Sequence, residues 1–294
     1  MIAVQAKRSH TIERVAVWVL RAAAGFVIFA IAALLLYLCF EGTKTFTVDH
    51  LPVWQFLFTS DFDPSAKKGG AAIFIVGTIV VTLFALCVGG PFGIAVGAFL
   101  SEIAPPRMAG ILKPAIEVLV GIPSVVYGWL GLRLLVPFLR EHTSSASGFG
   151  LAAAGIVLSI MILPTVISLS EDAFRSLPGA LREGSMALGS TRWQTIVRVL
   201  LPSASSGLSV ALILGMARAI GETLAVQMVL GNATQFANSL FAPTVALTTE
   251  IVIDMPGATQ GSFLEHELFS MALFLLLLAM ALILLVRFVL RKRV

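Results

Sequence analysis

The feature that most constrains this chain is a stretch of 33 residues, from Gly69 to Ser101, that contains no charged side chain. A helix needs about 20 apolar residues to cross the hydrocarbon core of a bilayer, because each residue advances it by about 1.5 Å. Similar apolar runs recur along the chain, at residues 22–40, 114–139, 150–170, 205–230 and 268–286. They show no alternation with a period of two residues, which favours helices over a barrel. Together the runs predict an all-α polytopic membrane protein with six main transmembrane helices.

The composition supports this class of protein. Apolar residues make up 58% of the 294-residue chain and charged residues only 12%, whereas a soluble domain carries about 25% charged residues. So few charges cannot cover a water-facing surface, which excludes a soluble enzyme and a disordered chain. The two cysteines, Cys39 and Cys87, lie within apolar runs, so we expect neither a disulfide framework nor a zinc site.

The first two runs are expected to differ in form. Residues 22–40 exceed the apolar core of a signal peptide, which is about 7–15 residues long, and no A-x-A cleavage site follows them, so we expect a retained anchor. The run from 69 to 101 is too long for one straight span. We expect it to be broken or bent at Gly89-Gly90-Pro91, because proline removes a backbone donor from a helix.

The distribution of Lys and Arg predicts the orientation. Fourteen of the 20 basic residues fall in segments that share a side with the N-terminus, and four fall in loops on the other side. Because basic residues concentrate in cytoplasmic loops, both termini are expected in the cytoplasm. We therefore predict a cytoplasmic N-terminal segment at 1–21 and a transmembrane domain at 22–290, with a long inner loop at 171–203 and a long outer loop at 231–267.

The outer loop has an unusual charge balance. It contains no Lys or Arg but carries Glu250, Asp254, Glu265 and Glu267. Its middle, residues 241–255, is apolar enough to turn back towards the membrane, and structureless loops of this length are uncommon. The sequence therefore predicts a re-entrant or interfacial segment in this loop.

The inner loop contains the most specific pattern. Its residues at fixed spacing are Glu183-Gly184-Ser185, Gly189, Val199, Leu201 and Pro202. Pro178-Gly179 would open a helix and Gly189 would end it, since glycine adopts the left-handed cap conformation without a Cβ clash. Thr191 and Gln194 form the capping-box pattern of a second helix. The loop is predicted to be a helix-turn-helix, and an ordinary amphipathic connector on the membrane surface is the alternative.

Two charged side chains, Arg218 and Glu222, stand inside the run at 205–230. Four residues apart, they would share one face of a helix. Each charge costs on the order of 3 kcal/mol at mid-bilayer, so both are expected to face the helix bundle or an aqueous cavity. In one interpretation Arg218 lines a path for an anion, which a guanidinium binds through two hydrogen bonds, and Glu222 neutralises it between transport events. In the other, the two form a fixed ion pair that only orients the helix.

The spacing in the inner loop resembles the EAA motif of binding-protein-dependent ABC importers, which reads E-A-A, three residues, G, nine residues and I-x-L-P. Gly184 and Ser185 replace its alanines, and Val199 replaces its isoleucine. Further stretches resemble the PstC-type permease subunits of phosphate importers, in the MetI-like permease family. They are G-I-P-S-V-V-Y-G at 121–128, M-I-L-P-T at 161–165, L-S-E-D-A at 169–173 and R-A-I-G-E-T at 218–223. The resemblance covers the chain from about Gly70 to the C-terminus.

This resemblance implies a MetI-like ABC permease fold in the inner membrane and a role in the import of inorganic phosphate. It implies that the inner loop is a coupling element that docks on a cytoplasmic ATPase through Glu183, Gly184, Ser185, Gly189, Leu201 and Pro202. The residues expected along the substrate pathway are Arg218, Glu222, Thr223 and Ser124. The partners that it implies are a homologous PstA-type permease subunit, two copies of the ATPase, an extracytoplasmic phosphate-binding protein and the lipid bilayer.

Other classes of activity lack support in the sequence. No G-x-x-x-x-G-K-[ST] phosphate loop occurs, so ATP and magnesium are expected on the partner ATPase and no cofactor on this chain. The four histidines are scattered, and we expect no metal site, no catalytic site and no nucleic-acid partner. Two alternatives stay open. A permease for another oxyanion, such as sulfate or molybdate, would share the inner-loop motif, whereas an ATP-independent transporter or channel would not need Glu183.

Overall fold

The computed structural model describes residues 2–143 and 146–291. Within these residues the regular structure is helical, and the only strand-like pairings are isolated bridges between Asp63 and Lys68 and between Gly231 and Thr244. In chain order the α-helices are α1 (Ile2–Gly42), α2 (Lys44–Thr47), α3 (Val53–Phe58), α4 (Ala72–Glu102), α5 (Pro106–Val120), α6 (Ser124–Leu130), α7 (Val136–His142), α8 (Leu151–Arg175), α9 (Gly179–Ala187), α10 (Arg192–Thr195), α11 (Leu201–Ser203), α12 (Ser205–Ile220), α13 (Leu224–Leu230), α14 (Leu247–Asp254) and α15 (Phe263–Arg291). Short 3-10 or π-helical turns occupy Pro64–Ala66, Gly131–Leu135, Ile196–Leu200 and Met255–Gly257.

The described helices include four to six candidate spans. Four stretches are long and apolar enough to cross a bilayer unaided, namely Ala16–Thr47, Ala72–Glu102, Leu151–Arg175 and Phe263–Phe288. Two bent helix pairs qualify when each is taken as one span: α5 meets the helix from Ser124 to His142 at 96°, and the helix from Arg192 to Ser203 meets α12 at 72°. Counting each bent pair as one span gives six, which confirms the predicted all-α architecture.

The central contact of the molecule is the packing of α4 on α8. Gly89, Gly93 and Gly97 of α4 face α8, so closely that a Cβ at Gly93 would lie 2.6 Å from the Val166 side chain. A Cβ at Gly97 would lie 2.9 Å from the backbone nitrogen of Glu171. Glycines at this spacing let two helix backbones approach each other, so that α4 and α8 form one tightly packed pair.

The predicted break in the second run is wrong. α4 continues through Pro91 as far as Glu102, a helix of 31 residues. Proline removes one backbone hydrogen bond, and the close packing on α8 before and after Pro91 outweighs that loss. The local signal for a break was therefore overridden by tertiary contacts.

Two other runs are each divided between two helices. The run at 114–139 divides between α5 and α6, and the run at 205–230 divides between α12 and α13. At the first break Pro123 has an extended conformation, with φ −57° and ψ 140°, and proline also disfavours a helical conformation for the residue before it. The span around the first break therefore begins at Pro106 and ends at His142, instead of covering the predicted residues 114–139.

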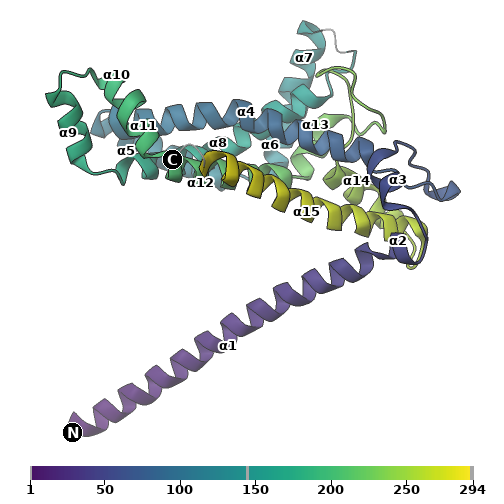
Figure 1. The fold of residues 1–294 in the computed structure, drawn as a ribbon, viewed down its shortest axis with the longest axis horizontal. Helices are drawn as coiled ribbons and strands as arrows, with labels where there is room; N and C mark the ends of the chain where they lie inside the picture. The colour runs from purple at the N-terminus through teal and green to yellow at the C-terminus, as the bar shows by residue number, and fades with distance from the viewer. Residues whose placement is uncertain (1, 144–145, 292–294) are drawn as a thin grey trace.

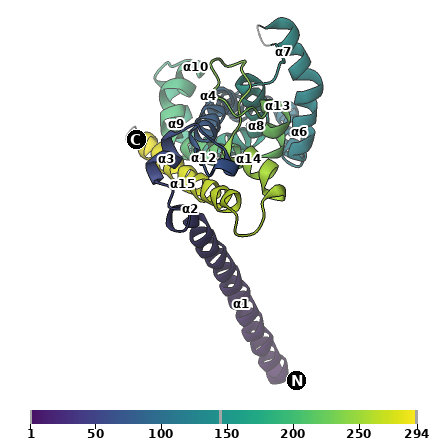
Figure 2. The ribbon, with the colours of Figure 1, turned by 90° about the vertical axis from the view of Figure 1, so that its right-hand side faces the viewer.

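α1 stands apart from the rest of the chain. It is one continuous helix that includes residues 2–21 of the predicted N-terminal segment, and it diverges from the helical body (Figures 1 and 2). Its contacts lie near its C-terminal end, where the Tyr37 ring meets the Phe269 ring of α15 edge-on at 5.8 Å. The apolar side chains along its described length are exposed, a surface that only lipid or another protein chain can cover.

The outer loop folds back on the helical body. Its helix α14 begins with four buried residues, Leu247–Glu250. The Leu247 N–H donates to Thr78 Oγ1 of α4 at 2.9 Å, and Gly77 lies directly against the Val245 carbonyl. A helix therefore lies within residues 241–255, the stretch predicted to be re-entrant or interfacial.

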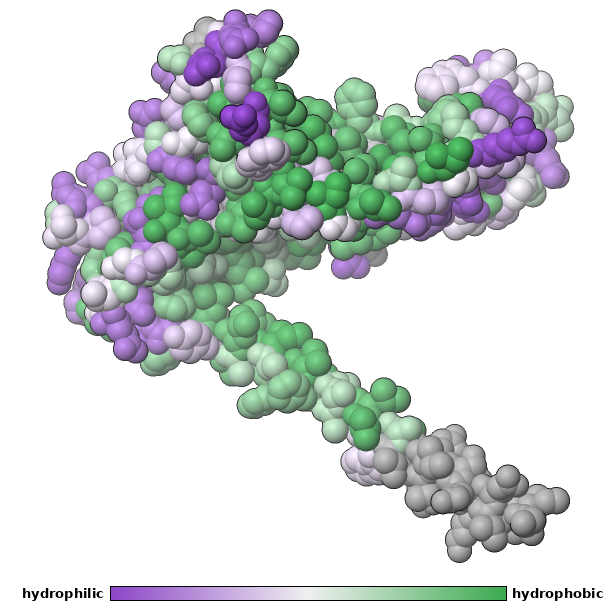
Figure 3. Space-filling model, turned by 180° about the vertical axis from the view of Figure 1, so that it is seen from behind, coloured by the Kyte–Doolittle hydropathy of each residue, from purple (hydrophilic) through white to green (hydrophobic). Residues whose placement is uncertain are grey.

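The surface divides into an apolar middle and two polar ends (Figure 3). Polar side chains gather over the inner loop at one end and over the outer loops at the other, with apolar side chains along the helices between them. A belt of this kind is what a bilayer-embedded molecule presents to lipid.

Candidate functional site at the broken helices and the inner loop

The break between α12 and α13 lies within the R-A-I-G-E-T stretch. α12 ends at Ile220 and α13 begins at Leu224, so Arg218 belongs to the last turn of α12 while Glu222 lies between the helices. The prediction that the two share one helix face is therefore wrong. Glu222 is instead held locally: its Oε1 accepts from the Ala225 N–H at 3.2 Å, and its backbone carbonyl accepts from Thr248 Oγ1 of α14 at 3.1 Å. A carboxylate in the first turn of a helix satisfies backbone donors that the helix leaves free.

Arg218 points towards α8 rather than towards Glu222. Its Nη1 donates to Thr165 Oγ1 at 3.4 Å, and Thr165 closes the M-I-L-P-T stretch. Among the described residues the ion pairs involve other side chains, so the fixed pair of Arg218 with Glu222 is absent there. The guanidinium is half-buried and keeps donors available for a ligand.

The break between α5 and α6 lies beside the α12–α13 break, because α6 packs on α13. The Tyr127 hydroxyl donates to the Leu119 carbonyl at 2.9 Å, which ties α6 to the end of α5. Gly128 packs on α13, because a Cβ there would lie 2.8 Å from Ala225 Cα. Three of the four stretches that resemble phosphate permeases, far apart in sequence, therefore meet at the α12–α13 break beside Arg218.

The two remaining predicted pathway residues lie at helix starts. Ser124 is the first residue of α6 and is half-buried. Thr223 immediately precedes α13, and its hydroxyl donates to the Gly221 carbonyl at 3.4 Å. Both lie at breaks in the helices, where backbone groups are freed, and no contact of either with Arg218 is found in the described part of the chain. The structure thus places Ser124, Thr223, Glu222 and Arg218 at or beside the two helix breaks. It does not join them into one hydrogen-bonded network.

Thr248 is a contributor that sequence reasoning missed. It reaches the α12–α13 break from α14, 26 positions after Glu222 in the chain. The only sequence signal was the apolar character of residues 241–255, which gave no indication of a partner. Because α14 is also hydrogen-bonded to Thr78 of α4, the outer loop connects the α12–α13 break to α4.

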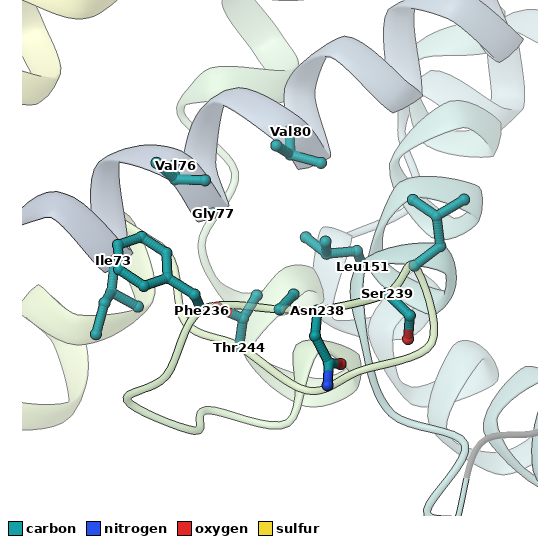
Figure 4. Close-up of a pocket in the computed structure, with 11 residues that line it drawn as sticks. Ile73, Val76, Gly77, Val80, Leu151, Phe236, Asn238, Ser239 and Thr244 are labelled. Carbon is teal, nitrogen blue, oxygen red and sulfur yellow. The ribbon is translucent and has the colours of Figure 1, made fainter. Parts of the chain in front are cut away.

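A cavity of about 320 Å³ lies between α4 and the outer loop (Figure 4). Its lining residues are Ile73, Val76, Gly77, Val80, Leu151, Phe236, Ala237, Asn238, Ser239, Leu240 and Thr244. Figure 4 shows Phe236, Asn238 and Ser239 on the outer loop opposite Val76 and Val80 of α4. None of the lining side chains is charged, so this cavity does not suit a bare anion, which needs opposite charge or several donors when it leaves water.

The inner loop forms the predicted helix-turn-helix. α9 begins at Gly179 after Pro178, and Gly189 follows it with φ +83°, the left-handed conformation that glycine adopts without strain. Thr191 and Gln194 form a reciprocal capping box, with bonds of 3.3 and 2.9 Å. The first part of the loop differs from expectation, because α8 continues to Arg175.

The inner loop presents one exposed surface. Glu183 and Gly184 are exposed, Leu188 is 89% exposed and Trp193 is 68% exposed. Leu201 and Pro202 are also exposed, at the start of α11. Ser185 is engaged within the loop, since its hydroxyl lies 3.0 Å from that of Thr195 and joins the two arms. We name the exposed set Glu183, Gly184, Leu188 and Trp193 the docking surface, after the role that the resemblance predicts for this loop.

The rest of the second arm anchors the loop. Ile196 and Leu200 are buried against Phe174 at the end of α8. Nearby, Glu171 of the L-S-E-D-A stretch is 1% exposed and pairs with Lys113 of α5 at 3.4 Å and with Arg175 at 2.8 Å. Sequence reasoning missed this ion-pair cluster, because Lys113 and Glu171 lie far apart in the chain.

Comparisons with known proteins agree with this architecture. Residues 89–294 match the family of binding-protein-dependent transport system inner membrane components. The chain is 46% identical to the probable ABC transporter permease protein YqgH of Bacillus subtilis, over 94% of this chain and 90% of that protein. It is 34% identical to the phosphate transport system permease protein PstC of Pasteurella multocida, over 82% and 81%, and 33% identical to that of Haemophilus influenzae, over 81% of each.

Solved structures share the fold. A bacterial alginate ABC transporter, crystallised with its alginate-bound periplasmic protein, superposes with a TM-score of 0.66 at 16% identity, over 94% of each chain. The MetNI methionine ABC transporter in an inward-facing conformation gives a TM-score of 0.58 at 21% identity, over 74% of this chain and 94% of that one. The family match extends over more than half of the sequence, and it includes α8, the inner loop and both half-helices of the α12–α13 break. The chain therefore belongs to the binding-protein-dependent transport system inner membrane components, as a multi-pass permease of the MetI-like type.

Proposed function

We propose that this chain is the permease subunit of an ATP-driven importer that carries inorganic phosphate across the inner membrane. The observation that carries the proposal is the convergence of three sequence stretches at the α12–α13 break beside Arg218, a guanidinium that donates to a hydroxyl and has no carboxylate partner among the described residues. A planar guanidinium binds two phosphate oxygens at once. The names of the PstC relatives support phosphate as the substrate.

The breaks beside Arg218 suit passage of a hydrated anion. Helical breaks inside a membrane are tolerated where the freed backbone groups face protein or a water-filled path. Ser124 and Thr223 stand at these breaks and would add hydroxyl donors, while Glu222, held by Ala225, would limit how tightly an anion binds. Weak binding is required for release on the inner side.

The proposal includes the partners that ATP-driven import requires. We infer a homologous PstA-type permease subunit, two copies of a cytoplasmic ATPase that binds ATP and magnesium, and an extracytoplasmic phosphate-binding protein. The docking surface would receive the ATPase, which places the inner loop and both termini in the cytoplasm. The outer loop, with α14 braced on the α12–α13 break, would face the binding protein.

Reconstitution tests the function directly. The complete complex is placed in lipid vesicles with ATP inside and the loaded binding protein outside, and uptake of labelled phosphate and labelled sulfate is compared. The proposal expects phosphate uptake that requires ATP and exceeds sulfate uptake at least tenfold. Preferential sulfate or molybdate uptake would identify a permease for another oxyanion, and uptake without ATP would identify a secondary transporter or channel.

A further inference from the structure

Arg182, the residue before Glu183, joins the inner loop to two transmembrane helices. Its Nε and Nη2 donate to both carboxylate oxygens of Glu102, at 2.8 and 2.7 Å. Its Nη2 also donates to the Phe174 carbonyl at 2.8 Å, and its Nη1 to the Leu177 carbonyl at 3.0 Å. Glu102 is the last residue of α4, and Phe174 lies in the last turn of α8. One side chain of α9 therefore holds the inner ends of both α4 and α8.

The burial and the geometry of the Arg182–Glu102 ion pair favour a rigid contact. The Glu102 side chain is 8% exposed and that of Arg182 is 24% exposed, so water screens the pair less than a surface ion pair. A bidentate guanidinium–carboxylate pair also fixes the relative orientation of its two groups. The Phe174 carbonyl at the end of α8 also accepts from the Leu177 N–H at 3.2 Å, and Arg182 adds a charged donor to it.

The other contacts of α9 lie mainly within the inner loop, apart from one apolar contact. The helix packs on the turn at Ile196–Leu200 and on α10, which belong to the same loop. Ser185 bonds to Thr195 within that loop, and Leu181 adds an apolar contact to the cluster around Phe174. Arg182 is thus the polar connection that leads from the docking surface to α4.

The helices that Arg182 holds lead to the candidate pathway. α4 and α8 pack through Gly89, Gly93 and Gly97 and should move as one body. α8 carries Thr165, which accepts from Arg218. α4 carries Thr78, which accepts from α14, and α14 bonds in turn to the Glu222 carbonyl at the α12–α13 break.

We propose that Arg182 is the positioning residue through which movement of α9 is transmitted to the α4–α8 pair and so to the pathway around Arg218. The inference rests on the proposed function in one respect, since a docked ATPase is needed to move α9. Arg182 does not touch the substrate in this assignment. It acts by keeping the docking surface and the α4–α8 pair mechanically connected.

The test uses the complete complex in lipid vesicles and measures ATP hydrolysis and phosphate uptake together. The variants are Arg182→Ala, Arg182→Lys and the charge exchange of Glu102→Arg with Arg182→Glu. Arg198→Ala is the matched control, because Arg198 is an exposed arginine of the same loop with no ion pair among the described residues. We expect Arg182→Ala to raise the ATP hydrolysed per phosphate imported about tenfold, with the KM for the loaded binding protein unchanged. Arg182→Lys should be intermediate, the charge exchange should recover at least half of the coupling, and Arg198→Ala should match the wild type.

A second measurement does not depend on the substrate. Hydrogen exchange of the α9 backbone amides in the same complex should be about tenfold faster in Arg182→Ala than in the wild type or in Arg198→Ala. Wild-type coupling in Arg182→Ala would overturn the proposal, even if α9 exchanged faster, and so would unchanged α9 exchange. If Arg182→Ala does not assemble, failure of the charge exchange to restore coupling would overturn it. A wild-type complex that hydrolyses ATP without importing phosphate would refute the proposed function, and α9 exchange would then decide the role of Arg182.

Discussion

Arg218 lies in the last turn of α12, where its guanidinium donates to the Thr165 hydroxyl of α8. As part of a continuous helix it would face Glu222 one turn away, and the pair could be structural. The break after Ile220 removes Glu222 from that face and leaves Arg218 directed at Thr165. A charge inside a membrane span without an opposite charge beside it is costly and is usually functional.

Replacing Arg218 should therefore affect transport more than assembly. We expect Arg218→Gln to lower phosphate uptake at least tenfold at normal amounts of assembled complex. The reason is that a neutral amide cannot form the bidentate, charge-assisted hydrogen bonds of a guanidinium. Arg218→Lys, which keeps the charge but loses the planar fork, should be intermediate. Arg133→Gln is the matched control, since Arg133 is exposed on the turn at Gly131–Leu135. Equal uptake by Arg218→Gln and Arg133→Gln would refute a role for Arg218 in the pathway.

Glu250 should give the folded chain a measurable pH dependence. Burial, together with the neighbouring Asp254 carboxylate, raises the pKa of Glu250 from 4.5 to about 7. The folded chain therefore holds this proton to a higher pH than the unfolded chain does. Its contribution to stability is present below about pH 4.5 and is lost as the pH rises through about 7, by up to about 3 kcal/mol.

Thermal unfolding of the purified chain in detergent checks this expectation. The midpoint should fall between about pH 5 and pH 8 in the wild type and should fall less in Glu250→Gln, which is neutral throughout. Glu141→Gln is the control, because Glu141 is exposed on α7. Parallel pH profiles for the wild type and Glu250→Gln would show that Glu250 is not the group that titrates.

At the scale of elements, the α4–α8 pair depends on glycines that leave no room for a side chain. Alanine is the better helix former by up to about 1 kcal/mol, yet a Cβ at Gly97 would lie 2.7 Å from Ser170 Cβ and 2.9 Å from a backbone nitrogen. Because backbone cannot move aside cheaply, overpacking should outweigh the gain in helix propensity.

Gly97→Ala should accordingly destabilise the chain by about 1–3 kcal/mol. Gly110→Ala on α5 should be neutral or slightly stabilising, because nothing lies within 4 Å of a Cβ at that position. The unfolding midpoints of the two purified variants in the same detergent give the comparison. A midpoint for Gly97→Ala at or above that of Gly110→Ala would contradict the close packing of α4 on α8.

At the scale of the whole molecule, the exposed features lie where partners are required. α1 is splayed from the body, apolar side chains cover the middle of the surface, and the docking surface stands at one polar end (Figures 1 and 3). Leu188, at the C-terminal end of α9, is 89% exposed, so it buries little apolar surface within the chain itself. An exposed apolar residue of this kind is typical of a contact with another protein.

Leu188→Ser should weaken binding of the ATPase while leaving the unfolding midpoint of the isolated chain unchanged. We expect a loss of at least tenfold in affinity, measured by co-purification at graded ATPase concentrations. Ile103→Ser is the matched control, since Ile103 is an apolar residue, 45% exposed, just beyond the inner end of α4. If both variants bind the ATPase equally well, the docking surface does not include Leu188.

Local patterns in the sequence predicted the elements that depend on local forces. Long apolar runs predicted the spans, and the Thr191 and Gln194 pair predicted a capping box that the structure contains. Where neighbours decide the conformation, local reading was wrong. Pro91 does not break α4, because α8 packs on both sides of it, and Glu222 leaves its helix although no proline follows.

The sequence by itself determined that this chain is an all-helical membrane protein with a helix-turn-helix in its inner loop, because hydrophobicity and helix capping act over one or two turns of chain. Only the tertiary structure decided which polar side chains meet. Arg182 with Glu102, Glu171 with Lys113 and Arg218 with Thr165 are each pairs of residues more than 50 positions apart. Contacts at that separation depend on how helices pack across the whole molecule, and no local pattern encodes them.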